Sequence, residues 1–394
     1  MPDTFHEVNG VALTSRHLES FARGRQIPFF SIHPGPVNET RIDGQVTMVQ
    51  LKRGPASIPL DTNLLCDPFL MRYANRVVKE IRGFHADLIH LTGPGDMGFL
   101  GLYAAWRLRL PLVISWHTSL HEYAARRLER LTKFLGSRAS ARLGRSVEML
   151  SLRLLKWFYQ RAKVILAPND ELVAFLQEMT RRPVFLMRRG VESEIFSPTR
   201  RNRSSGPFRI GYVGRLTTEK NVRFLAELSH RLVALGHRDF EFVVIGQGTD
   251  SDWLREHVVN VILPGVLHGI PLAEAYASMD LFVFPSTTDT FGNVILEALS
   301  SGVPAVVTSD GGPKFLVRHG ITGYIASNGS EFIDHVSGLL VDRVTHARMC
   351  HAARLYAAGI SWDSVFEDVL QAYRHCVEVS AASKVRTVSN RVMA

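Results

Sequence analysis

Two stretches in the second half of the chain decide its fold: Gly211-Tyr-Val-Gly-Arg-Leu-Thr-Thr-Glu-Lys-Asn221 and Phe284-Pro-Ser-Thr-Thr-Asp-Thr-Phe-Gly-Asn-Val-Ile-Leu-Glu-Ala298. Each follows an apolar run, passes through a polar loop and continues into a helical pattern, which is typical of a βα unit. A third loop, Thr308-Ser-Asp-Gly-Gly-Pro313, comes after another apolar run. The carboxyl ends of parallel strands meet at one edge of a sheet, so we expect the three loops to share one ligand site.

The alternation of apolar runs and helical patterns covers both halves of the 394-residue chain. Strands are expected at Pro28–His33, Asp87–Leu91, Leu112–Trp116, Val164–Ala167, Phe208–Val213, Phe240–Ile245, Val261–Leu263, Leu281–Phe284 and Ala305–Thr308. This pattern predicts an α/β protein of two doubly wound, Rossmann-like domains with a cleft between them. We expect the first domain at 1–197, a polar linker at 198–207, the second domain at 208–360, and at 361–394 a tail and a helix that packs back on the first domain.

The beginning of the chain departs from this pattern. Residues 1–10 are loop-like, and a helical pattern runs from about Leu13 to Ala22. A doubly wound domain normally opens with a buried strand ahead of its first loop and helix. Two interpretations stay open: the start codon is misplaced, or the fold has lost one edge of its first sheet.

Composition and charge narrow the class of protein. With 46% hydrophobic and 21% charged residues the chain is typical of a globular protein, and it has no signal-peptide pattern and no apolar stretch long enough to span a membrane. Its three cysteines lie far apart, which argues against a disulfide framework or a zinc site. We therefore expect a cytoplasmic protein. The excess positive charge behind its net charge of +9 lies in residues 1–200.

The first of the opening stretches carries two cations five residues apart, Arg215 and Lys220. Gly214 allows a sharp turn at the strand end, and a helix is expected to begin near Asn221, so that its amide-rich N-terminus adds to a positive region. An arginine fork and a mobile lysine together suit a diphosphate. A surface turn with two solvated cations is the alternative interpretation of this stretch taken alone.

The second stretch carries two carboxylates. Asp289 precedes a helix expected over about Gly292–Ser301, and Glu297 lies inside it. Burial of Glu297 in the apolar run 294–299 is costly without polar partners, and sugar hydroxyls are suitable ones. Helix capping is the alternative role for Asp289, and an exposed surface position is the weaker alternative for Glu297. The glycines of the third loop suit close approach of a ligand, although a tight turn explains them nearly as well.

Together these motifs resemble the donor domain of the family-four retaining glycosyltransferases of the GT-B fold. The matching elements are Gly-Arg-Leu-x-x-Glu-Lys-Asn at 214–221, Gly246-Gln-Gly248, Asp280–Ser286 and the acid pair Asp289 and Glu297, with weaker matches at Asp3–Val11, Trp116–Thr118, Gly190–Pro198 and a closing helix from Trp362 to Tyr373. The resemblance implies transfer of a hexosyl unit from a UDP- or GDP-sugar to a hydroxyl acceptor. It also implies retention of configuration, with no metal ion and no cofactor.

The resemblance assigns the nucleotide-facing roles to five residues. Arg215 and Lys220 would hold the donor diphosphate and stabilise its charge as the nucleotide leaves, with Gly214 at the turn. Glu297 would accept hydrogen bonds from the ribose hydroxyls. Gly10 would let the first loop of the other domain approach the phosphates.

The sugar-facing roles fall on five further residues. Asp289 would bind hydroxyls of the transferred sugar, assisted by the backbone amides of Phe291, Gly292 and Asn293. His117 would lie near the anomeric carbon, where it contacts the sugar or orients the acceptor. Asp289 stands where the family more often has Glu, which shortens the side chain by one methylene.

The segment 126–163 bears on the acceptor. It holds eleven Lys and Arg against two Glu, interleaved with apolar residues, and this pattern resembles a basic amphipathic helical hairpin more than a nucleic-acid groove. We expect it to bind an anionic membrane surface, with the protein peripheral on the inner face of the membrane and no nucleic acid as partner. The acceptor would then be a membrane lipid or lipid-linked glycan. The alternative is a helix pair with a solvated basic face, and a soluble acceptor.

Three other classes of protein stay open. Gly93-Pro-Gly-Asp-Met-Gly98 matches the GxGxxG pattern of nicotinamide-dependent oxidoreductases, but the proline fits that turn poorly and no acidic residue follows at the usual distance. The second class is a binding protein that keeps the fold without catalysis; competent residues at every matched polar position argue against it. An epimerase or phosphorylase of the GT-B fold is the third.

Overall fold

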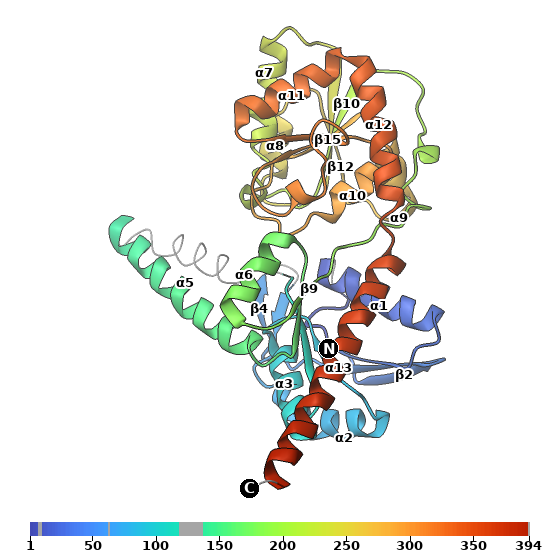
Figure 1. Ribbon diagram of the computed structural model, residues 1–394. Helices are drawn as coiled ribbons and strands as arrows, with labels where there is room; N and C mark the ends of the chain where they lie inside the picture. Colours follow the sequence, from blue (N-terminus) through green and yellow to red (C-terminus); the bar gives the residue numbers. More distant parts are fainter. Residues whose placement is uncertain (7–9, 62–63, 118–136, 393–394) are drawn as a thin grey trace. The chain divides into compact units, whose positions relative to one another are not determined.

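The computed structural model describes residues 1–6, 10–61, 64–117 and 137–392 (Figure 1). The chain forms two compact units. Unit 1 consists of Met1–Arg188 together with Phe366–Ala394, and unit 2 of Arg189–Val365. Each unit is an α/β body with its own core, and the cleft that we expect between the two stays a prediction.

Unit 2 is built on a six-stranded parallel sheet in the order β12-β11-β10-β13-β14-β15. The strands are β10 (Phe208–Val213), β11 (Phe240–Ile245), β12 (Val261–Gly265), β13 (Leu281–Phe284), β14 (Ala305–Thr308) and β15 (Gly323–Ala326). Helices cover both faces of this sheet (Figure 1). The chain moves outward from β10 to β12 and then returns to β13 on the other side of β10. The order reverses between β10 and β13, which is where ligands of doubly wound sheets bind.

The helices of unit 2 follow the strands in alternation. They are η3 (Pro198–Arg200), η4 (Thr218–Lys220), α7 (Phe224–Ala234), α8 (Ser251–His257), α9 (Gly269–Ala277), α10 (Asn293–Ser300), η5 (Pro313–Phe315), α11 (Gly329–Val341) and α12 (Arg343–Ala358). The helix expected near Asn221 starts later than predicted. A short 3-10 turn comes first, Asn221 adopts a left-handed conformation with φ of 53°, and α7 begins only at Phe224.

The segment 198–207, which we expect as a linker, lies within unit 2. The Arg201 guanidinium is 2.8 Å from Asp280 Oδ1 and also donates to two backbone carbonyls at the end of α9 and beyond it. Arg203 lies 3.7 Å from the same Asp280 carboxylate. These ion pairs hold a polar, basic segment on the body of the unit, because its charges find carboxylate partners there.

Unit 1 contains two main sheets that are not joined to each other in the described part of the chain. A parallel sheet has the order β6 (Ile89–Leu91), β7 (Leu112–Ser115), β8 (Val164–Ala167) and β9 (Val184–Leu186). A second sheet has the order β1 (Phe29–Gly35), β3 (Val46–Lys52) and β2 (Glu39–Asp43), with β1 and β3 parallel. A hairpin of β4 (Ile58–Asp61) and β5 (Leu64–Cys66) accompanies them.

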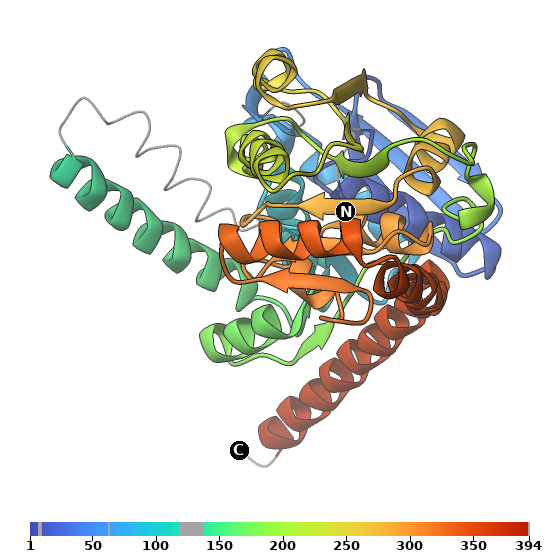
Figure 2. The same ribbon diagram turned by 90° about the horizontal axis from the view of Figure 1, so that it is seen from above.

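The helices of unit 1 complete its α/β pattern. They are α1 (Gly10–Gly24), η1 (Leu70–Tyr73), α2 (Ala74–Phe84), α3 (Asp96–Leu108), α5 (Ser137–Tyr159), α6 (Asp170–Thr180) and α13 (Trp362–Val392). Figure 2 shows the length of α13, which belongs to unit 1 from Phe366 onward. Phe366 packs on Phe21 of α1, with ring centroids 5.5 Å apart. None of the described helices is both long and apolar enough to cross a membrane.

Candidate functional site

Two loops meet at the point of unit 2 where the strand order reverses. The loop after β10 carries Lys220, whose Nζ lies 2.6 Å from Oδ1 of Asp289 in the loop after β13. The Asn221 side chain donates to the carbonyl of Pro285, and the Thr288 hydroxyl donates to the carbonyl of Glu219, each over 3.3 Å. Three contacts therefore join the two loops whose convergence we predicted.

The third predicted loop closes on the second. The amide of Gly312 donates to the carbonyl of Asp289 over 2.7 Å, and the Thr308 hydroxyl donates to the carbonyl of Ser286 over 2.9 Å. A Cβ atom at Gly312 would collide with the carbonyl of Thr290. Glycine is needed there because the two backbones touch. The three loops thus form one cluster at the carboxyl ends of β10, β13 and β14.

The Lys220–Asp289 pair is mostly buried, with side-chain exposures of 13% and 23%. Asp289 Oδ1 is bonded to Lys220, whereas its Oδ2 is buried and has no hydrogen-bond partner in the described part of the chain. A buried carboxylate oxygen without a partner is costly unless something donates to it. The atom is therefore a candidate contact for hydroxyl groups of a ligand.

Arg215 is half-buried at the turn after β10. Its carbonyl accepts a hydrogen bond of 3.2 Å from the hydroxyl of Tyr212, the penultimate residue of β10. Burial raises the pKa of Tyr212, and the negative charge of Asp289 adds to this effect. At the same turn Gly214 has φ of 157°, and a Cβ atom there would lie 2.9 Å from the Tyr212 hydroxyl. The tyrosine thus fills the space beneath the turn.

Glu297 is the fifth residue of α10 and so lies inside the helix, as predicted. Burial raises its pKa to about 7, and the charge of Glu192 adds to the rise, whereas the nearby Tyr276 hydroxyl opposes it. Tyr276 is itself fully buried on α9. A carboxyl with this pKa is half protonated near neutral pH. Its ionised form is the better acceptor for ligand hydroxyls, so the free energy needed to ionise it before it binds them depends on pH.

The turn into α10 is built by Phe291, Gly292 and Asn293. Phe291 is buried, Gly292 has φ of 101° and precedes the helix, and Asn293 is its first residue. The left-handed conformation of Gly292 turns the backbone so that α10 can begin a few residues after Asp289. These three residues therefore lie at the cluster, while their contact with a sugar stays a prediction.

The two predicted residues of unit 1 lie elsewhere in the chain. Gly10 is exposed and is the first residue of α1. His117 follows β7, and its Nε2 shares a hydrogen bond of 2.7 Å with the hydroxyl of Ser115. That hydroxyl is 3.0 Å from Nε2 of His90, whose Nδ1 is 2.7 Å from the Tyr373 hydroxyl. Burial lowers the pKa of His90 to about 3, so a neutral imidazole orients the chain of bonds that ends at His117.

The glycine pattern at 93–98 has a different role from the one that a dinucleotide site requires. Oδ1 of Asp3 accepts hydrogen bonds of 3.1 and 3.3 Å from the amides of Met97 and Gly98 in the first turn of α3. A Cβ atom at Gly95 would collide with the Asp3 carboxyl. Because a carboxylate of the protein occupies the amides that would bind pyrophosphate, this loop argues against an oxidoreductase.

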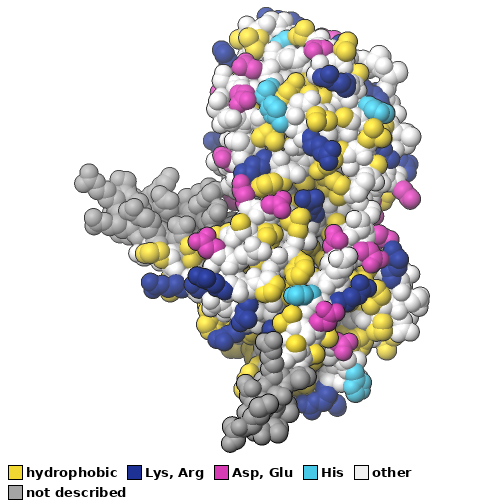
Figure 3. All heavy atoms as spheres, in the orientation of Figure 1, with side chains coloured by type: hydrophobic (Ala, Val, Ile, Leu, Met, Phe, Trp, Pro, Cys, Tyr) yellow, Lys and Arg dark blue, Asp and Glu magenta, His cyan; other side chains and the backbone are white. Residues whose placement is uncertain are grey.

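Part of the basic segment, 126–136, lies outside the described residues, and α5 accounts for much of the rest. Its described apolar side chains include four exposed ones, Met149, Leu150, Leu154 and Trp157, with exposures of 42–67%. Arg153 and Lys156 are exposed among them, and the Arg161 guanidinium lies 4.7 Å from the Trp157 ring centroid. Figure 3 shows yellow and dark blue side chains side by side in this region. The described part of α5 thus has an exposed surface that is both apolar and basic.

Sequence reasoning missed Tyr212, Tyr276 and Asp250. The two tyrosines sit in apolar stretches of a strand and a helix, so they are indistinguishable from core residues until their hydroxyls are located. Asp250 is buried and accepts hydrogen bonds from Thr218 and Arg223, which fix the loop after β10. Among the residues that the structure describes, no group of three His, Cys, Asp or Glu side chains could hold a metal ion.

Fold and site together define a glycosyltransferase of the GT-B fold. Residues 207–342 match the model of "Glycosyl transferases group 1", and residues 34–195 match that of "Glycosyltransferase Family 4". The chain belongs to this glycosyltransferase family.

Known relatives agree with this assignment. A GDP-mannose-dependent alpha-mannosyltransferase of Corynebacterium glutamicum is 30% identical over 314 residues, which cover 77% of this chain and 71% of the relative. An enzyme of the same name from Mycobacterium tuberculosis is 31% identical over 310 residues, covering 76% and 75% of the two chains. A sulfoquinovosyl transferase of Arabidopsis thaliana is 29% identical over 75% of this chain and 58% of its own.

Solved structures show the same fold. A sucrose-phosphate synthase of Thermosynechococcus elongatus superimposes with a TM-score of 0.70 at 17% identity, covering 96% of both chains. Anabaena HepE in complex with UDP and glucose gives a TM-score of 0.65 at 16% identity, covering 95% of this chain and 98% of its own. The predicted α/β fold and the predicted family are confirmed.

Proposed function

We propose that this protein transfers a hexosyl unit from a nucleoside-diphosphate sugar to a hydroxyl acceptor, with retention of configuration and without a bound metal ion. The observation that carries the proposal is the Lys220–Asp289 pair at the point where the strand order reverses, with Asp289 Oδ2 buried and lacking a partner. Lys220 is a cation suited to phosphate, Asp289 is a carboxylate suited to sugar hydroxyls, and the two form one ion pair. A sugar attached to a diphosphate needs this combination.

In this proposal Lys220 and Arg215 bind the diphosphate and stabilise the negative charge that develops on it as the glycosidic bond breaks. Charge stabilisation by fixed cations in a partly buried site is a large contribution to catalysis. The same two cations make a metal ion dispensable. His117 would lie on the acceptor side, held by Ser115 through the 2.7 Å hydrogen bond.

Glu297 is proposed to bind the ribose. Two hydroxyls on neighbouring carbons donate best to an ionised carboxylate, so nucleotide binding should lower the raised pKa of Glu297. The donor that we propose to test first is GDP-mannose, because the names of three relatives at 30–31% identity specify it. UDP-glucose is the second, because HepE has been solved with it.

A donor panel tests the reaction. The protein is mixed with GDP-mannose, GDP-glucose, UDP-glucose or UDP-galactose, with a lipid extract or a soluble sugar, and nucleoside diphosphate release is followed. We expect release of nucleoside diphosphate only when donor and acceptor are both present. The bond from mannose to phosphate in GDP-mannose is axial, so retention predicts an axial linkage in the product, which NMR measures. A change of sugar without acceptor would indicate an epimerase, and a requirement for orthophosphate would indicate a phosphorylase.

The acceptor is proposed to be a membrane lipid or a lipid-linked glycan. The exposed apolar and basic surface of α5 supports this, since such helices bind anionic membranes. A relative from Acholeplasma laidlawii at 23% identity is named an alpha-monoglucosyldiacylglycerol synthase. A soluble acceptor is the alternative.

Liposome sedimentation separates the two acceptors. The protein should sediment with vesicles that contain anionic lipid. Trp157→Ala should reduce the sedimented fraction several-fold, because it removes an apolar contact with the membrane and the ring that lies against the Arg161 guanidinium. The control is Trp106→Ala, which removes an exposed tryptophan from α3. Equal sedimentation of the two variants with the vesicles, or no sedimentation of the wild type, would favour the soluble acceptor.

A further inference from the structure

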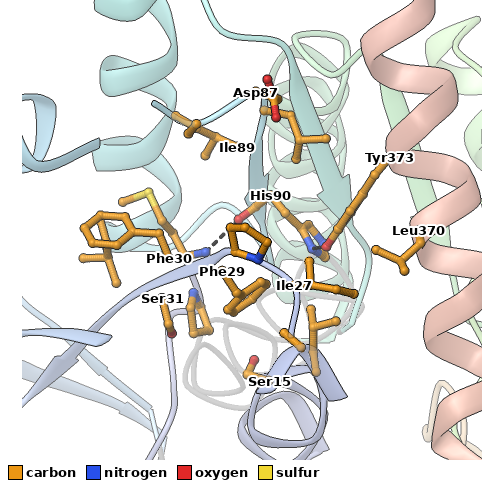
Figure 4. A pocket seen from close by; sticks show the side chains of 18 of the residues that line it. Ser15, Ile27, Phe29, Phe30, Ser31, Asp87, Ile89, His90, Leu370 and Tyr373 are labelled. Atoms are coloured by element: carbon orange, nitrogen blue, oxygen red, sulfur yellow. Dashed lines mark hydrogen bonds between the residues drawn. The ribbon is translucent and has the colours of Figure 1, made fainter. Parts of the chain in front are cut away.

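Four polar side chains form a continuous line of hydrogen bonds inside unit 1. The Tyr373 hydroxyl of α13 lies 2.7 Å from Nδ1 of His90 in β6, and Nε2 of His90 lies 3.0 Å from the Ser115 hydroxyl at the end of β7. That hydroxyl is 2.7 Å from Nε2 of His117. Figure 4 shows the Tyr373 side chain reaching from α13 to the His90 ring. The line therefore connects the last helix of the chain with the residue that we place on the acceptor side.

The Ser115 hydroxyl restricts where the hydrogens of this line can lie. Ser115 is buried, and its single hydrogen can be donated to only one of the two imidazole nitrogens beside it. Because His90 is neutral, it carries a hydrogen on one nitrogen only, so it donates one of its two bonds and accepts the other. The bonds can therefore run from Tyr373 to His117, or in the opposite direction.

The distances favour the direction that starts at Tyr373. Hydroxyl donors form shorter hydrogen bonds, of about 2.7–2.8 Å, than N–H donors, which prefer about 2.9–3.0 Å. The two hydroxyls lie 2.7 Å from Nδ1 of His90 and from Nε2 of His117, and the 3.0 Å contact between them fits an N–H donor on His90. The Ser115 hydroxyl also lies 3.4 Å from the Leu91 carbonyl, which is too long to draw its hydrogen away from His117.

The Tyr373 end of the line favours the same direction. Burial raises the pKa of the Tyr373 hydroxyl, so it keeps its hydrogen at neutral pH. In the direction that starts at Tyr373, that hydrogen is bonded to His90. In the opposite direction the hydrogen would need another acceptor, and within the described ranges His90 is the hydroxyl's hydrogen-bond partner. Leaving a buried polar hydrogen without an acceptor is costly, so the first direction is the more stable one.

We propose that Tyr373 and His90 are positioning residues that, through Ser115, fix the tautomer of His117 with its hydrogen on Nδ1. The Ser115 hydroxyl occupies the lone pair of Nε2, so His117 offers a ligand an N–H group rather than a lone pair. It would donate a hydrogen bond to an oxygen of the transferred sugar or of the acceptor, and it would not act as a general base. This ligand contact rests on the proposed function, whereas the tautomer does not.

NMR of protein labelled with nitrogen-15 in its histidines measures the tautomer without donor or acceptor. The signals of His117 are identified by their absence from the spectrum of His117→Gln. At pH 7.5 we expect Nδ1 of His117 to have the chemical shift of a nitrogen that carries a hydrogen, and Nε2 that of a nitrogen without one. A hydrogen on Nε2 of His117 in the wild type overturns the proposal.

Tyr373→Phe tests whether the line of bonds sets this tautomer. Without the hydroxyl, Nδ1 of His90 has no partner in either direction, so the His117 signals should move to intermediate values as two tautomers exchange. Tyr103→Phe, which removes a hydroxyl from α3, is the matched control and should leave them unchanged. Unchanged His117 signals in Tyr373→Phe overturn the proposal. If that variant does not fold, Ser115→Ala replaces it: loss of the donor to Nε2 should move the signals toward the Nε2–H tautomer, and unchanged signals again overturn the proposal.

Two substitutions of His117 test the ligand contact with the donor and acceptor found in the panel. His117→Asn keeps an N–H donor close to the position of Nδ1, so its kcat/KM should exceed that of His117→Leu by about fivefold, the value of one hydrogen bond between uncharged groups. Equal losses of about 10²-fold or more in both variants would indicate a general base and overturn the ligand contact. Absence of transfer with every donor would instead contradict the proposed function, and the NMR result would still decide the tautomer.

Discussion

Replacing Glu297 with glutamine tests whether burial controls the protonation of the carboxyl assigned to the ribose. Its pKa is 4.5 in an unfolded chain and about 7 in the folded one. Between these values the folded protein holds a proton that the unfolded chain has released, so the unfolding free energy falls as pH rises from about 4.5 to about 7 and is constant above. The full difference is worth about 3 kcal/mol.

Urea unfolding of wild type and Glu297→Gln at pH 5 to 8.5 measures this effect. Glutamine does not titrate, so its stability relative to wild type should increase by up to about 3 kcal/mol across this range and level off above pH 7. Glu256→Gln on α8, which replaces an exposed side chain, is the control. A constant difference for Glu297→Gln as well would refute the effect of burial.

The same protonation should appear in nucleotide binding. If Glu297 binds the ribose as proposed, the ribose hydroxyls need its ionised carboxylate, so below pH 7 the affinity of the wild type for GDP should fall by up to tenfold per pH unit. Glu297→Gln should bind GDP more weakly at pH 8 and show little pH dependence. Titration calorimetry at pH 5.5, 6.5, 7.5 and 8.5 checks both. Equal pH profiles for the two proteins would contradict the ribose assignment.

Three further substitutions probe other contacts. Lys220→Ala should lower kcat/KM by about 10²-fold or more because it removes a cation from the proposed diphosphate site, whereas Lys79→Ala on the exposed face of α2 should leave kcat/KM unchanged; initial rates measure both. Gly214→Ala places a Cβ atom 2.9 Å from the Tyr212 hydroxyl at φ of 157°, and urea unfolding should show a loss of about 1–3 kcal/mol. Asp3→Ala removes the acceptor for the first amides of α3 and should cost about 1–2 kcal/mol, and an unchanged Tm would contradict this capping role.

Much of the fold was predictable because buried parallel strands read as continuous apolar runs. β8, β10, β11, β13 and β14 have the predicted bounds. The strand β2 was not predicted, since its sequence Glu-Thr-Arg-Ile-Asp is almost entirely exposed and carries no apolar signal. β3, β9 and β15 were missed as well, and the last of these is a short edge strand that opens on a glycine.

The candidate site was predictable where it depends on strand ends. The loops after β10, β13 and β14 converge because parallel strands place their carboxyl ends together, and the sequence marks those ends clearly. What the residues alone could not provide is the partner of each group. Lys220 and Asp289 were assigned to separate parts of a ligand, and the structure pairs them directly. Contacts of this kind depend on side-chain distances across two loops that are 69 residues apart.

The Lys220–Asp289 pair also bears on competition among cellular anions. While the two groups are bonded, they neutralise each other, and an incoming anion must replace a carboxylate that is already in place. Inorganic phosphate or a nucleoside monophosphate would gain an ion pair with Lys220, but this contact would do little more than replace the ion pair with Asp289 that it breaks. In the proposed site a sugar diphosphate would bind the released lysine through its phosphates and would donate sugar hydroxyls to the released aspartate, so both halves of the broken pair would find new partners. On this proposal, discrimination against abundant small anions would come from the Asp289 carboxylate, which competes with them for Lys220, rather than from the shape of the site.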